Sequence, residues 1–369
     1  MAIKRREVLK AGLVGAALAG TRIGTACESL NVLILGGTGF IGPHMVEEAL
    51  RRGHNLTLFN RGRTNTDLFP DVEKIKGDRA NDHSEIANRK WDVVIDNSGY
   101  VPRHVETAAR VLSPNINHYV FISTISVYES FATPNHEDSP LAQLEDETVE
   151  EVTGETYGGL KALCEQRAAD VMGDDRLTVL RPTYICGPGD HTDRFSYWPV
   201  RTARGGEMIW PGGRDYPVQI IDVRDLARFT FDCVEERIAG IYNMVNPAGS
   251  YTMGDLLDDS VAASGAEIDP IWVDESFIDA AREEFTVRNR GMFPIWHPLD
   301  DEYGAVSSIS DTRAKAAGLK ARPVRETIEA LLAWWQTLPE ERQSDLRAGL
   351  PADIEVQLIE RWKTSQAES

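Results

Sequence analysis

A glycine-rich turn between an apolar strand and a helix is the feature that most constrains the fold of this chain. Residues 30–35 read Leu-Asn-Val-Leu-Ile-Leu and are followed by Gly-Gly-Thr-Gly-Phe-Ile-Gly and an apolar-periodic stretch. In such a turn Gly36 permits the tight bend, Gly39 lets the backbone approach a pyrophosphate, and Gly42 lets helix and strand pack closely. A second apolar run at 55–59 follows. This order predicts a parallel α/β sheet that binds a dinucleotide.

The residues around this turn also bear on which dinucleotide binds. A helix beginning at Phe40 and Ile41 would direct its N-terminus toward the phosphates. The second strand ends at Asn60 and Arg61, with a further arginine two residues later, and not in the carboxylate that binds the ribose 2′-hydroxyl of NAD. These arginines could pair with a 2′-phosphate, which favours NADP over NAD; the alternative is that they are solvated loop charges. Asp78, after a third short strand, is placed to hydrogen-bond the adenine amine.

A tyrosine and a lysine four residues apart follow the fifth predicted strand, which spans 118–123. Tyr157 and Lys161 share one face of a helix, because positions i and i+4 lie one turn apart. A neighbouring ammonium favours the phenolate, so Lys161 would make Tyr157 a general acid/base. Thr124, at the end of the strand, is placed to hydrogen-bond the substrate oxygen. The alternative is a surface tyrosine and lysine on an ordinary helix.

Taken together, these motifs resemble the extended short-chain dehydrogenase/reductase family, the NAD-dependent epimerase/dehydratase group. The resemblance implies that Thr124, Tyr157 and Lys161 form a catalytic triad and that the cofactor is NADP or NAD. It also implies a small-molecule substrate, a sugar or nucleotide sugar, and an enzyme that is often a homodimer. The residues that carry the resemblance are 36–42, Gly77 with Asp78, Thr124 four residues before Tyr128, Tyr157 with Lys161, Arg181 with Pro182, 186–190, 223–227 and 314–319.

Three departures from the family pattern bear on the chemistry. Family dehydratases are expected to carry Asp-Glu directly after the catalytic threonine, whereas this chain has Ile125 and Ser126, which disfavours sugar 4,6-dehydration. The fourth predicted strand, 91–96, is followed by Asn-Ser-Gly where alanines are usual, which leaves the nicotinamide contacts open. The stretch 58–62 is similar to an atypical subgroup with chloroplast RNA-binding members. A non-catalytic dinucleotide-sensing or RNA-binding protein is therefore the alternative hypothesis.

The charge balance weighs against that alternative. The 369 residues include 58 Asp and Glu against 39 Lys and Arg, a formal net charge of −19. Because nucleic-acid binding draws most of its affinity from Lys and Arg that neutralise phosphates, no nucleic-acid partner is expected. The four cysteines share no C-x-x-C spacing, so no metal site is expected either.

The second half of the chain is expected to form a smaller substrate-binding lobe. A Gly-Pro-Gly-Asp turn at 187–190 follows a strand, where ligands of open α/β sheets gather. The next loop is rich in aromatic residues and contains a cation, so His191, Arg194 and Tyr197 are candidate substrate residues. The alternative is a loop packed between the lobes.

The first residues have the pattern of a twin-arginine export signal. A Lys-Arg-Arg sequence begins at Lys4 and precedes an apolar stretch at 11–19 that is too short to span a bilayer. We expect a signal peptide over 1–27, export to the periplasm or the extracellular space, and no membrane association after its removal. Lipidation of Cys27 stays open. The alternatives are an amphipathic or floppy N-terminal extension and a cytoplasmic protein.

These observations combine into one architecture and one activity. The fold class is α/β, a Rossmann-type doubly wound parallel sheet with a smaller C-terminal substrate-binding lobe. A helix predicted at 351–363 is expected to be peripheral. The activity is NAD(P)-dependent oxidation, reduction or epimerisation by hydride transfer at a secondary alcohol or carbonyl carbon of a sugar-like substrate. The signal peptide, the NAD(P)-binding domain, the substrate lobe interleaved with the last strands, and a C-terminal helical extension are expected at 1–27, 28–186, 187–338 and 339–369.

Overall fold

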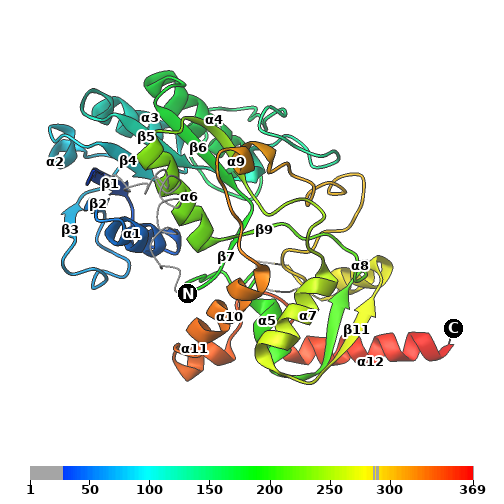
Figure 1. Cartoon of the computed structure of the whole chain (residues 1–369). Coiled ribbons are helices and arrows are strands. Elements are labelled where there is room, and N and C mark those ends of the chain that lie inside the picture. Colours follow the sequence, from blue (N-terminus) through cyan, green and yellow to red (C-terminus); the bar gives the residue numbers. More distant parts are fainter. Residues whose placement is uncertain (1–27, 286, 288–290, 369) are drawn as a thin grey trace, which may run out of the picture.

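A seven-stranded parallel sheet forms the centre of the molecule (Figure 1). The computed structural model describes residues 28–285, 287 and 291–368, so the expected signal peptide, with Cys27, lies outside the described residues. The strand order β10-β6-β5-β4-β1-β2-β3 is that of a doubly wound α/β sheet, which confirms the predicted fold class. The strands are β1 (Asn31–Leu35), β2 (Asn55–Asn60), β3 (Glu73–Lys76), β4 (Val93–Asp96), β5 (His118–Ile122), β6 (Leu177–Pro182) and β10 (Gly240–Met244).

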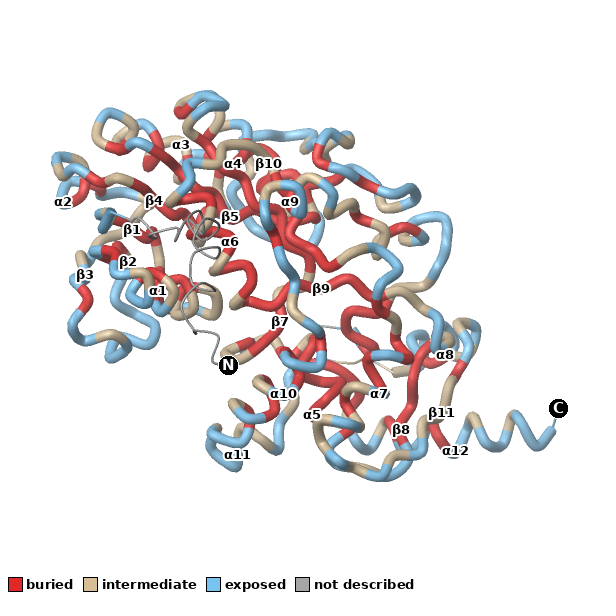
Figure 2. The backbone as a smooth tube through the Cα atoms, viewed as in Figure 1, coloured by how far each residue is buried: buried red, intermediate tan, exposed pale blue. Residues whose placement is uncertain are grey.

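Apolar side chains on both faces of the central strands explain why the sheet lies between two layers of helices. On β1, Val32 and Ile34 join the core on one face, and Leu33 and Leu35 join the core on the other. A strand that is covered on both faces needs such a continuous apolar run, and Figure 2 shows the strands as the buried centre. The first layer contains α1 (Ile41–Arg51), α6 (Val223–Glu236) and α9 (Thr312–Ala316), and the second contains α2 (Ser84–Ala87), α3 (Pro102–Leu112) and α4 (Tyr157–Met172).

A smaller lobe follows the sixth strand and has its own hydrophobic core. Tryptophans are central to it: the Trp198 and Trp210 ring centres lie 4.8 Å apart, and Trp272 lies 5.6 Å from Trp210. Two short parallel pairs, β8 with β11 and β7 with β9, supplement its helices. The elements are β7 (Tyr184–Cys186), α5 (Tyr197–Ala203), β8 (Gly206–Pro211), β9 (Ile220–Asp222), α7 (Met253–Ser264), β11 (Ile268–Val273), α8 (Glu275–Glu284) and α10 (Val324–Trp335).

The C-terminal segment packs against this lobe through α11 (Glu340–Ser344) and α12 (Ala352–Glu368). Glu355 of α12 is 2% exposed, and it accepts hydrogen bonds from Arg201 Nε (2.6 Å) and from the N–H of Ile209 (3.2 Å). The expectation that this helix is peripheral is wrong for its first turns, because a buried carboxylate gives no apolar signal in the sequence. Only the far end of α12 projects beyond the lobe (Figure 1).

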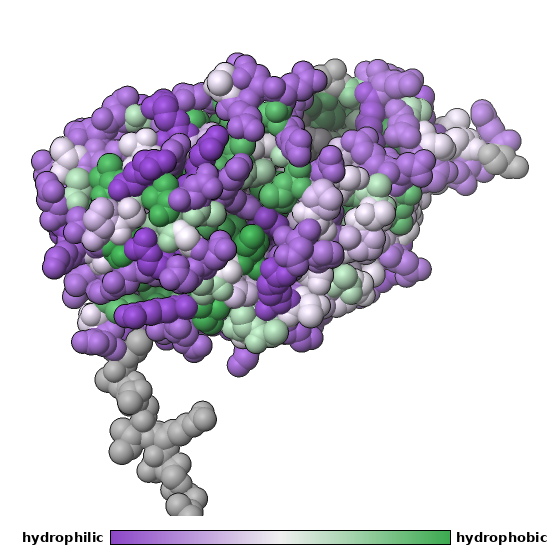
Figure 3. Space-filling model, turned by 90° about the horizontal axis from the view of Figure 1, so that it is seen from above, coloured by the Kyte–Doolittle hydropathy of each residue, from purple (hydrophilic) through white to green (hydrophobic). Residues whose placement is uncertain are grey.

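The surface is largely hydrophilic. Figure 3 shows hydrophilic side chains over most of the face seen from above, with hydrophobic ones in small groups between them. Among the residues that the structure describes, no helix is both long and apolar enough to cross a membrane.

Candidate active site

The glycine turn joins β1 to α1 in a conformation that favours glycine. Gly36 and Gly37 have φ angles of +120° and +96°. The N–H of Gly36 donates to the carbonyl of Phe59 at the end of β2 (2.9 Å), which ties the turn to the neighbouring strand. A Cβ added at Gly36 would lie 2.3 Å from Asn97 Oδ1. A side chain at this position would therefore disturb both the turn and the end of β4.

The next two glycines have different surroundings. A Cβ built on Gly39 meets nothing within 4 Å, so the space above the turn is open where a pyrophosphate would approach. A Cβ on Gly42 would lie 2.4 Å from the carbonyl carbon of Gly37, so Gly42 lets the helix contact the turn itself and not the strand. Phe40 caps α1 without a side-chain hydrogen bond and Ile41 begins the helix, which leaves the first N–H groups available to an anion. This open cradle and free helix N-terminus fit a dinucleotide pyrophosphate.

The end of β2 carries the groups expected to choose between cofactors. Asn60 Nδ2 donates to the carbonyl of Gly36 (2.9 Å), and its Oδ1 accepts from the backbone two residues later (2.9 Å), so this side chain shapes the turn. Arg61 and Arg63 are exposed, and neither contacts a partner within the described ranges. Lys76, which pairs with Asn60 across the β2–β3 ladder, is also exposed. Three exposed cationic side chains therefore lie near the end of β2, the position at which a carboxylate would select NAD.

Asp78 makes hydrogen bonds within its own turn. Its Oδ1 accepts the N–H of Ala80 (3.0 Å), and its carbonyl accepts the N–H groups of Asn81 and Asp82 (2.9 Å each). The other carboxylate oxygen accepts no hydrogen bond from the part of the chain that the structure describes, so it is left for a ligand amine. Contact between Asp78 and adenine stays a prediction.

Thr124 and Tyr157 meet at the carboxyl end of β5. Thr124 caps the short 3₁₀ helix η2 (Ile125–Val127), and its hydroxyl accepts the N–H of Ser126 (3.1 Å). Tyr157 is the first residue of α4, and its phenol lies close enough to Thr124 for this side chain to lower the pKa of Tyr157. Ligands of parallel sheets bind at this edge. The structure therefore brings these two predicted residues together where a substrate would lie.

Lys161 lies on the same helix and points into the protein. Its ammonium, in a side chain only 2% exposed, donates to the carbonyls of Gly99 (2.7 Å) and Ile122 (2.8 Å) and lies 4.0 Å from the centre of the Phe121 ring. Burial lowers the pKa of Lys161 to about 8. An ammonium has three N–H donors, so one remains for a ligand.

The pKa of Tyr157 is raised, contrary to the expectation from the sequence. Burial raises it, and Tyr100 adds to the rise, whereas the neighbouring Thr124 side chain and the charge of Arg194 lower it. Lys161 is not among the groups that lower the pKa of Tyr157, and its ammonium donates to two carbonyl oxygens. Tyr157 is therefore protonated at neutral pH and begins as a hydrogen-bond donor.

Tyr100 is a site residue that the sequence reasoning missed. Its ring centre lies 6.4 Å from that of Tyr157 and 5.4 Å from Lys161 Nζ, and the side chain is 47% exposed. It directly follows Gly99 at the end of the β4 turn. That position at a strand end is the signal that could have identified it.

A buried ion pair stabilises the segment that follows β4. Asp96 is fully buried, and it accepts hydrogen bonds from both terminal nitrogens of Arg79 (2.5 and 2.6 Å) and from the Tyr119 hydroxyl (2.8 Å). Burial alone would raise the pKa of Asp96, but the charge and hydrogen bonds of Arg79 hold it below its ordinary value. Arg79 also donates to Ser98 Oγ (3.2 Å). The pair therefore steadies the segment whose Gly99 carbonyl holds the lysine.

Two of the three candidate substrate residues lie near the site. The Arg194 guanidinium is 5.0 Å from the centre of the Tyr184 ring, and its charge lowers the pKa of Tyr157. His191 is exposed, and its ring centre lies 6.4 Å from that of Phe40 in the glycine turn. The loop therefore reaches both the tyrosine and the cofactor cradle.

Tyr197 does not line the site. Its side chain is 0% exposed and packs in the smaller lobe, with its ring centre 5.1 Å from that of Trp198 and against Gly349. A side chain without exposed surface offers no contact to a ligand, so we withdraw Tyr197 as a substrate residue. The aromatic richness of the loop reflects packing at this position.

Tyr184 and His297 form a polar pair beside Arg194 that no sequence motif indicated. The Tyr184 hydroxyl lies 2.7 Å from His297 Nε2, and the His297 ring stacks on Tyr303 with ring centres 5.1 Å apart. Burial raises the pKa of Tyr184 and lowers that of His297, so both side chains are held in their neutral forms. The two residues are 113 apart in the chain, which explains why local patterns do not reveal them.

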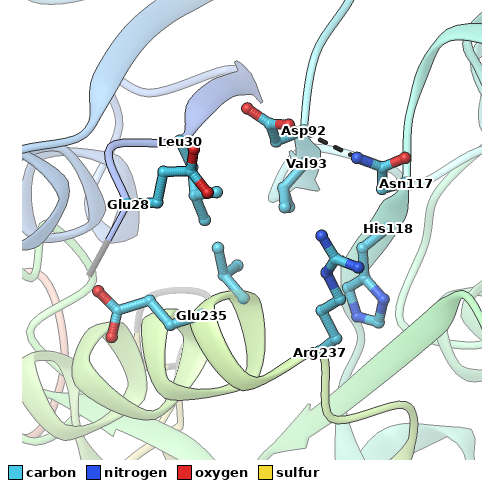
Figure 4. Close-up of a pocket in the computed structure, with 9 residues that line it drawn as sticks. Glu28, Leu30, Asp92, Val93, Asn117, His118, Glu235 and Arg237 are labelled. Carbon is cyan, nitrogen blue, oxygen red and sulfur yellow. Dashed lines mark hydrogen bonds between the residues drawn. The ribbon is translucent and has the colours of Figure 1, made fainter. Parts of the chain in front are cut away.

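A cavity of about 230 Å³ lies at the opposite edge of the sheet, near the amino ends of β1, β4 and β5 (Figure 4). Because ligands of parallel sheets bind at the carboxyl ends, this cavity is not the expected site. The cavity is lined by Glu28, Leu30, Asp92, Val93, Asn117, His118, Val234, Glu235 and Arg237.

Among the described residues, no group of three or more His, Cys, Asp or Glu could hold a metal ion, and Cys164, Cys186 and Cys233 are free and buried.

Residues 32–244, more than half of the chain, match the NAD dependent epimerase/dehydratase family. The chain belongs to this family. The match begins in β1 and ends with β10, so it contains the glycine turn, Thr124, Tyr157 and Lys161. The resemblance inferred from the motifs is confirmed, and membership makes the protein an enzyme of the epimerase/dehydratase type.

Curated relatives of the chain carry different names. It is 25% identical over 227 residues to the chloroplast stem-loop binding protein of 41 kDa b of Arabidopsis thaliana. The aligned region covers 55% of this chain and 54% of that protein. It is 27% identical over 263 residues to the 2-alkyl-3-oxoalkanoate reductase of Stenotrophomonas maltophilia, 64% of this chain and 76% of that protein. The chain thus spans about half the length of the chloroplast relative.

Solved structures share the fold at low sequence identity. The Bordetella bronchiseptica enzyme WbmG in complex with NAD and UDP has a TM-score of 0.62 and 17% identity, covering 85% of this chain and 96% of that chain. The UDP-N-acetylglucosamine 4-epimerase of Methanobrevibacter ruminantium has a TM-score of 0.62 and 18% identity, covering 84% and 99%. At this identity the likeness concerns the fold alone.

Proposed function

We propose that the enzyme transfers a hydride between a nicotinamide cofactor and a secondary alcohol or carbonyl carbon of a sugar-like substrate, with Tyr157 as general acid/base. The juxtaposition of Tyr157, at the start of α4, and Thr124, at the carboxyl end of β5 and thus at the ligand-binding edge of the sheet, is the observation that carries this proposal. The family match and the open cradle at Gly39 support it.

Tyr157, Thr124 and Lys161 have different roles in the proposed reaction, according to their positions. The bound dinucleotide supplies the hydride donor or acceptor. Tyr157, protonated at neutral pH, donates its proton to the carbonyl oxygen in reduction and accepts the hydroxyl proton in oxidation. Thr124 holds the same oxygen with its hydroxyl. Lys161 keeps one N–H donor for the nicotinamide ribose.

Replacement of the tyrosine tests the proposal. Tyr157→Phe should lower kcat by about 10²–10⁴-fold, the usual contribution of a general acid/base, and leave the Kd for the cofactor nearly unchanged. Tyr242→Phe is the matched control, because its hydroxyl only donates to the carbonyl of Ala239 (2.8 Å). The cofactor itself would be identified after denaturing the purified protein.

Unchanged turnover in Tyr157→Phe would refute the assignment. Salt-sensitive RNA binding without redox turnover would favour the non-catalytic alternative instead. The chloroplast relative is named for stem-loop binding.

The exposed cations at the end of β2 support NADP as the preferred cofactor. Arg61, Arg63 and Lys76 have no described carboxylate partner, although most arginines in this acidic protein contact a carboxylate or a carbonyl. Arg61→Ala should raise the Kd for NADPH about tenfold and change that for NADH little. Arg110→Ala, on the exposed side of α3, is the control. Equal losses for both cofactors would contradict the preference.

A sugar or nucleotide sugar is the substrate class that the relatives support. Structural neighbours include MoeE5 in complex with UDP-glucose and NAD. Ile125 and Ser126 occupy the positions where dehydratases of the family are expected to carry an acid and a base, so we propose epimerisation, oxidation or reduction and not 4,6-dehydration. If the enzyme is exported, as proposed next, the substrate is not the cytoplasmic nucleotide-linked form.

We also propose export by the twin-arginine route, which carries folded proteins and thus a loaded cofactor. The Lys-Arg-Arg sequence at Lys4 and the short apolar stretch after it support this. Mass spectrometry of the exported protein should show the loss of about 26 residues. Replacement of Arg5 and Arg6 by lysine should retain the protein in the cytoplasm. An intact Met1 found in cytoplasmic fractions alone would refute export.

A further inference from the structure

Asp193 is a buried residue that the proposed chemistry does not use. It lies in the substrate loop directly before Arg194, its side chain is 0% exposed, and its φ is +59°. Aspartate tolerates this left-handed conformation better than most residues with a Cβ, so the burial of its carboxylate is the more informative feature. A buried carboxylate needs partners, and the contacts that supply them show what holds the loop.

The C-terminal extension supplies those contacts. Arg342 Nη2 donates to one Asp193 carboxylate oxygen (2.5 Å), and the N–H of Arg347 donates to the other (2.8 Å). Arg347 Nη1 also donates to the carbonyl of His191 (3.1 Å). The Arg342 guanidinium lies 4.6 Å from the centre of the Trp335 ring, which limits its movement. The loop is thus held by residues about 150 positions later in the chain.

The other side of the same loop rests on the cofactor cradle. His44 Nε2 lies 2.8 Å from the carbonyl of Pro188, and a Cβ added at Gly189 would lie 3.5 Å from the Phe40 ring. The His191 and Phe40 ring centres are 6.4 Å apart, nearly perpendicular at 84°. The loop therefore contacts both the start of α1 and the C-terminal extension, and Arg194 directly follows the residue that the extension holds.

We propose that Asp193 and Arg342 are positioning residues, which hold the substrate loop against the cofactor turn and direct Arg194 toward Tyr157. This inference rests on the proposed function, because it assigns the loop to the cofactor and substrate site. The family match ends at residue 244, before the extension that contains Arg342. The extension is thus a part of the site that the family pattern does not supply.

The test compares folded variants by cofactor binding and by local amide exchange. Arg342→Gln removes the charge and should raise the Kd for NADPH about tenfold, the loss expected when the binding-competent loop is populated about a tenth of the time. Amide exchange should accelerate in residues 187–194. Arg342→Lys should restore most of the binding, because a single N–H donor reaches Asp193. Arg361→Gln on α12, which removes an exposed ion pair with Glu284 of α8, is the matched control.

A purely structural role would lower the melting temperature without a selective change in loop exchange or in the Kd for NADPH. If Arg342→Gln does not fold, Asp193→Asn replaces it, because asparagine tolerates the left-handed conformation and still accepts the N–H of Arg347. A folded variant with unchanged Kd and unchanged loop exchange would overturn the positioning role and leave the proposed function intact. A wild-type protein that binds neither NADPH nor NADH would overturn both.

Discussion

The buried ion pair between Glu165 and Arg181 allows a quantitative prediction about stability. Glu165 lies one turn after Lys161 on α4, and Arg181 lies on β6, with exposures of 5% and 1%. The Glu165 carboxylate accepts Arg181 Nη2 (2.6 Å), Arg181 Nε (3.0 and 3.2 Å) and the Ser123 hydroxyl (2.5 Å). The Glu165 carboxylate therefore joins the helix that carries Tyr157 to β6, through Arg181, and to the end of β5, through Ser123.

Glu165→Gln is expected to lower the free energy of unfolding by about 3–5 kcal/mol, because it leaves a buried guanidinium without its counter-charge. Glutamine has one acceptor oxygen, and its amide would face donors from both Arg181 and Ser123. The double variant Glu165→Leu with Arg181→Met should recover most of the loss, since no charge then remains buried.

Urea unfolding followed by far-ultraviolet circular dichroism measures this difference. Glu73→Gln is the control, because the Glu73 and Arg89 side chains are 50% and 41% exposed and such surface pairs contribute about 0–1 kcal/mol. A loss below about 1 kcal/mol for Glu165→Gln, equal to that of the control, would refute the reasoning from burial.

Two further predictions concern the glycine turn and the pH dependence of stability. Gly42→Ala should destabilise the fold by about 1–3 kcal/mol, because its Cβ would lie 2.4 Å from Gly37. Gly39→Ala should leave the stability unchanged and weaken only cofactor binding. Thermal unfolding measures the first effect and cofactor titration the second. Burial lowers the pKa of His118 from 6.5 to about 4. The unfolded state then binds the extra proton, so stability should fall by at most about 3 kcal/mol as pH drops from 6.5 to 4, and His118→Gln should flatten this slope.

The strands and the glycine turn could be predicted because they depend on local patterns. The continuous apolar run through Val32 and Ile34 required a strand covered on both faces. The predicted boundaries of the first, second, fourth and fifth strands agree with β1, β2, β4 and β5 within about two residues. The i, i+4 spacing of Tyr157 and Lys161 placed both on α4. These features need only the neighbours along the chain.

Contacts between distant segments could not be predicted in the same way. Tyr184 meets His297 across 113 residues, and Asp193 meets Arg342 across 149 residues. Nothing in the local sequence of either partner records such a contact. For the same reason Tyr197 looked like a substrate residue, although it is buried in the smaller lobe.

The amino-acid sequence by itself determined the fold class, the family and the positions of the cofactor turn and of Thr124, Tyr157 and Lys161 in the chain. Only the tertiary structure decided the pKa values of these side chains and the partners toward which they point. Burial raises the pKa of Tyr157 and lowers that of Lys161, and two carbonyls turn the lysine away from its expected role. The physical reason is that desolvation and hydrogen bonding act through space, between segments that the fold brings together.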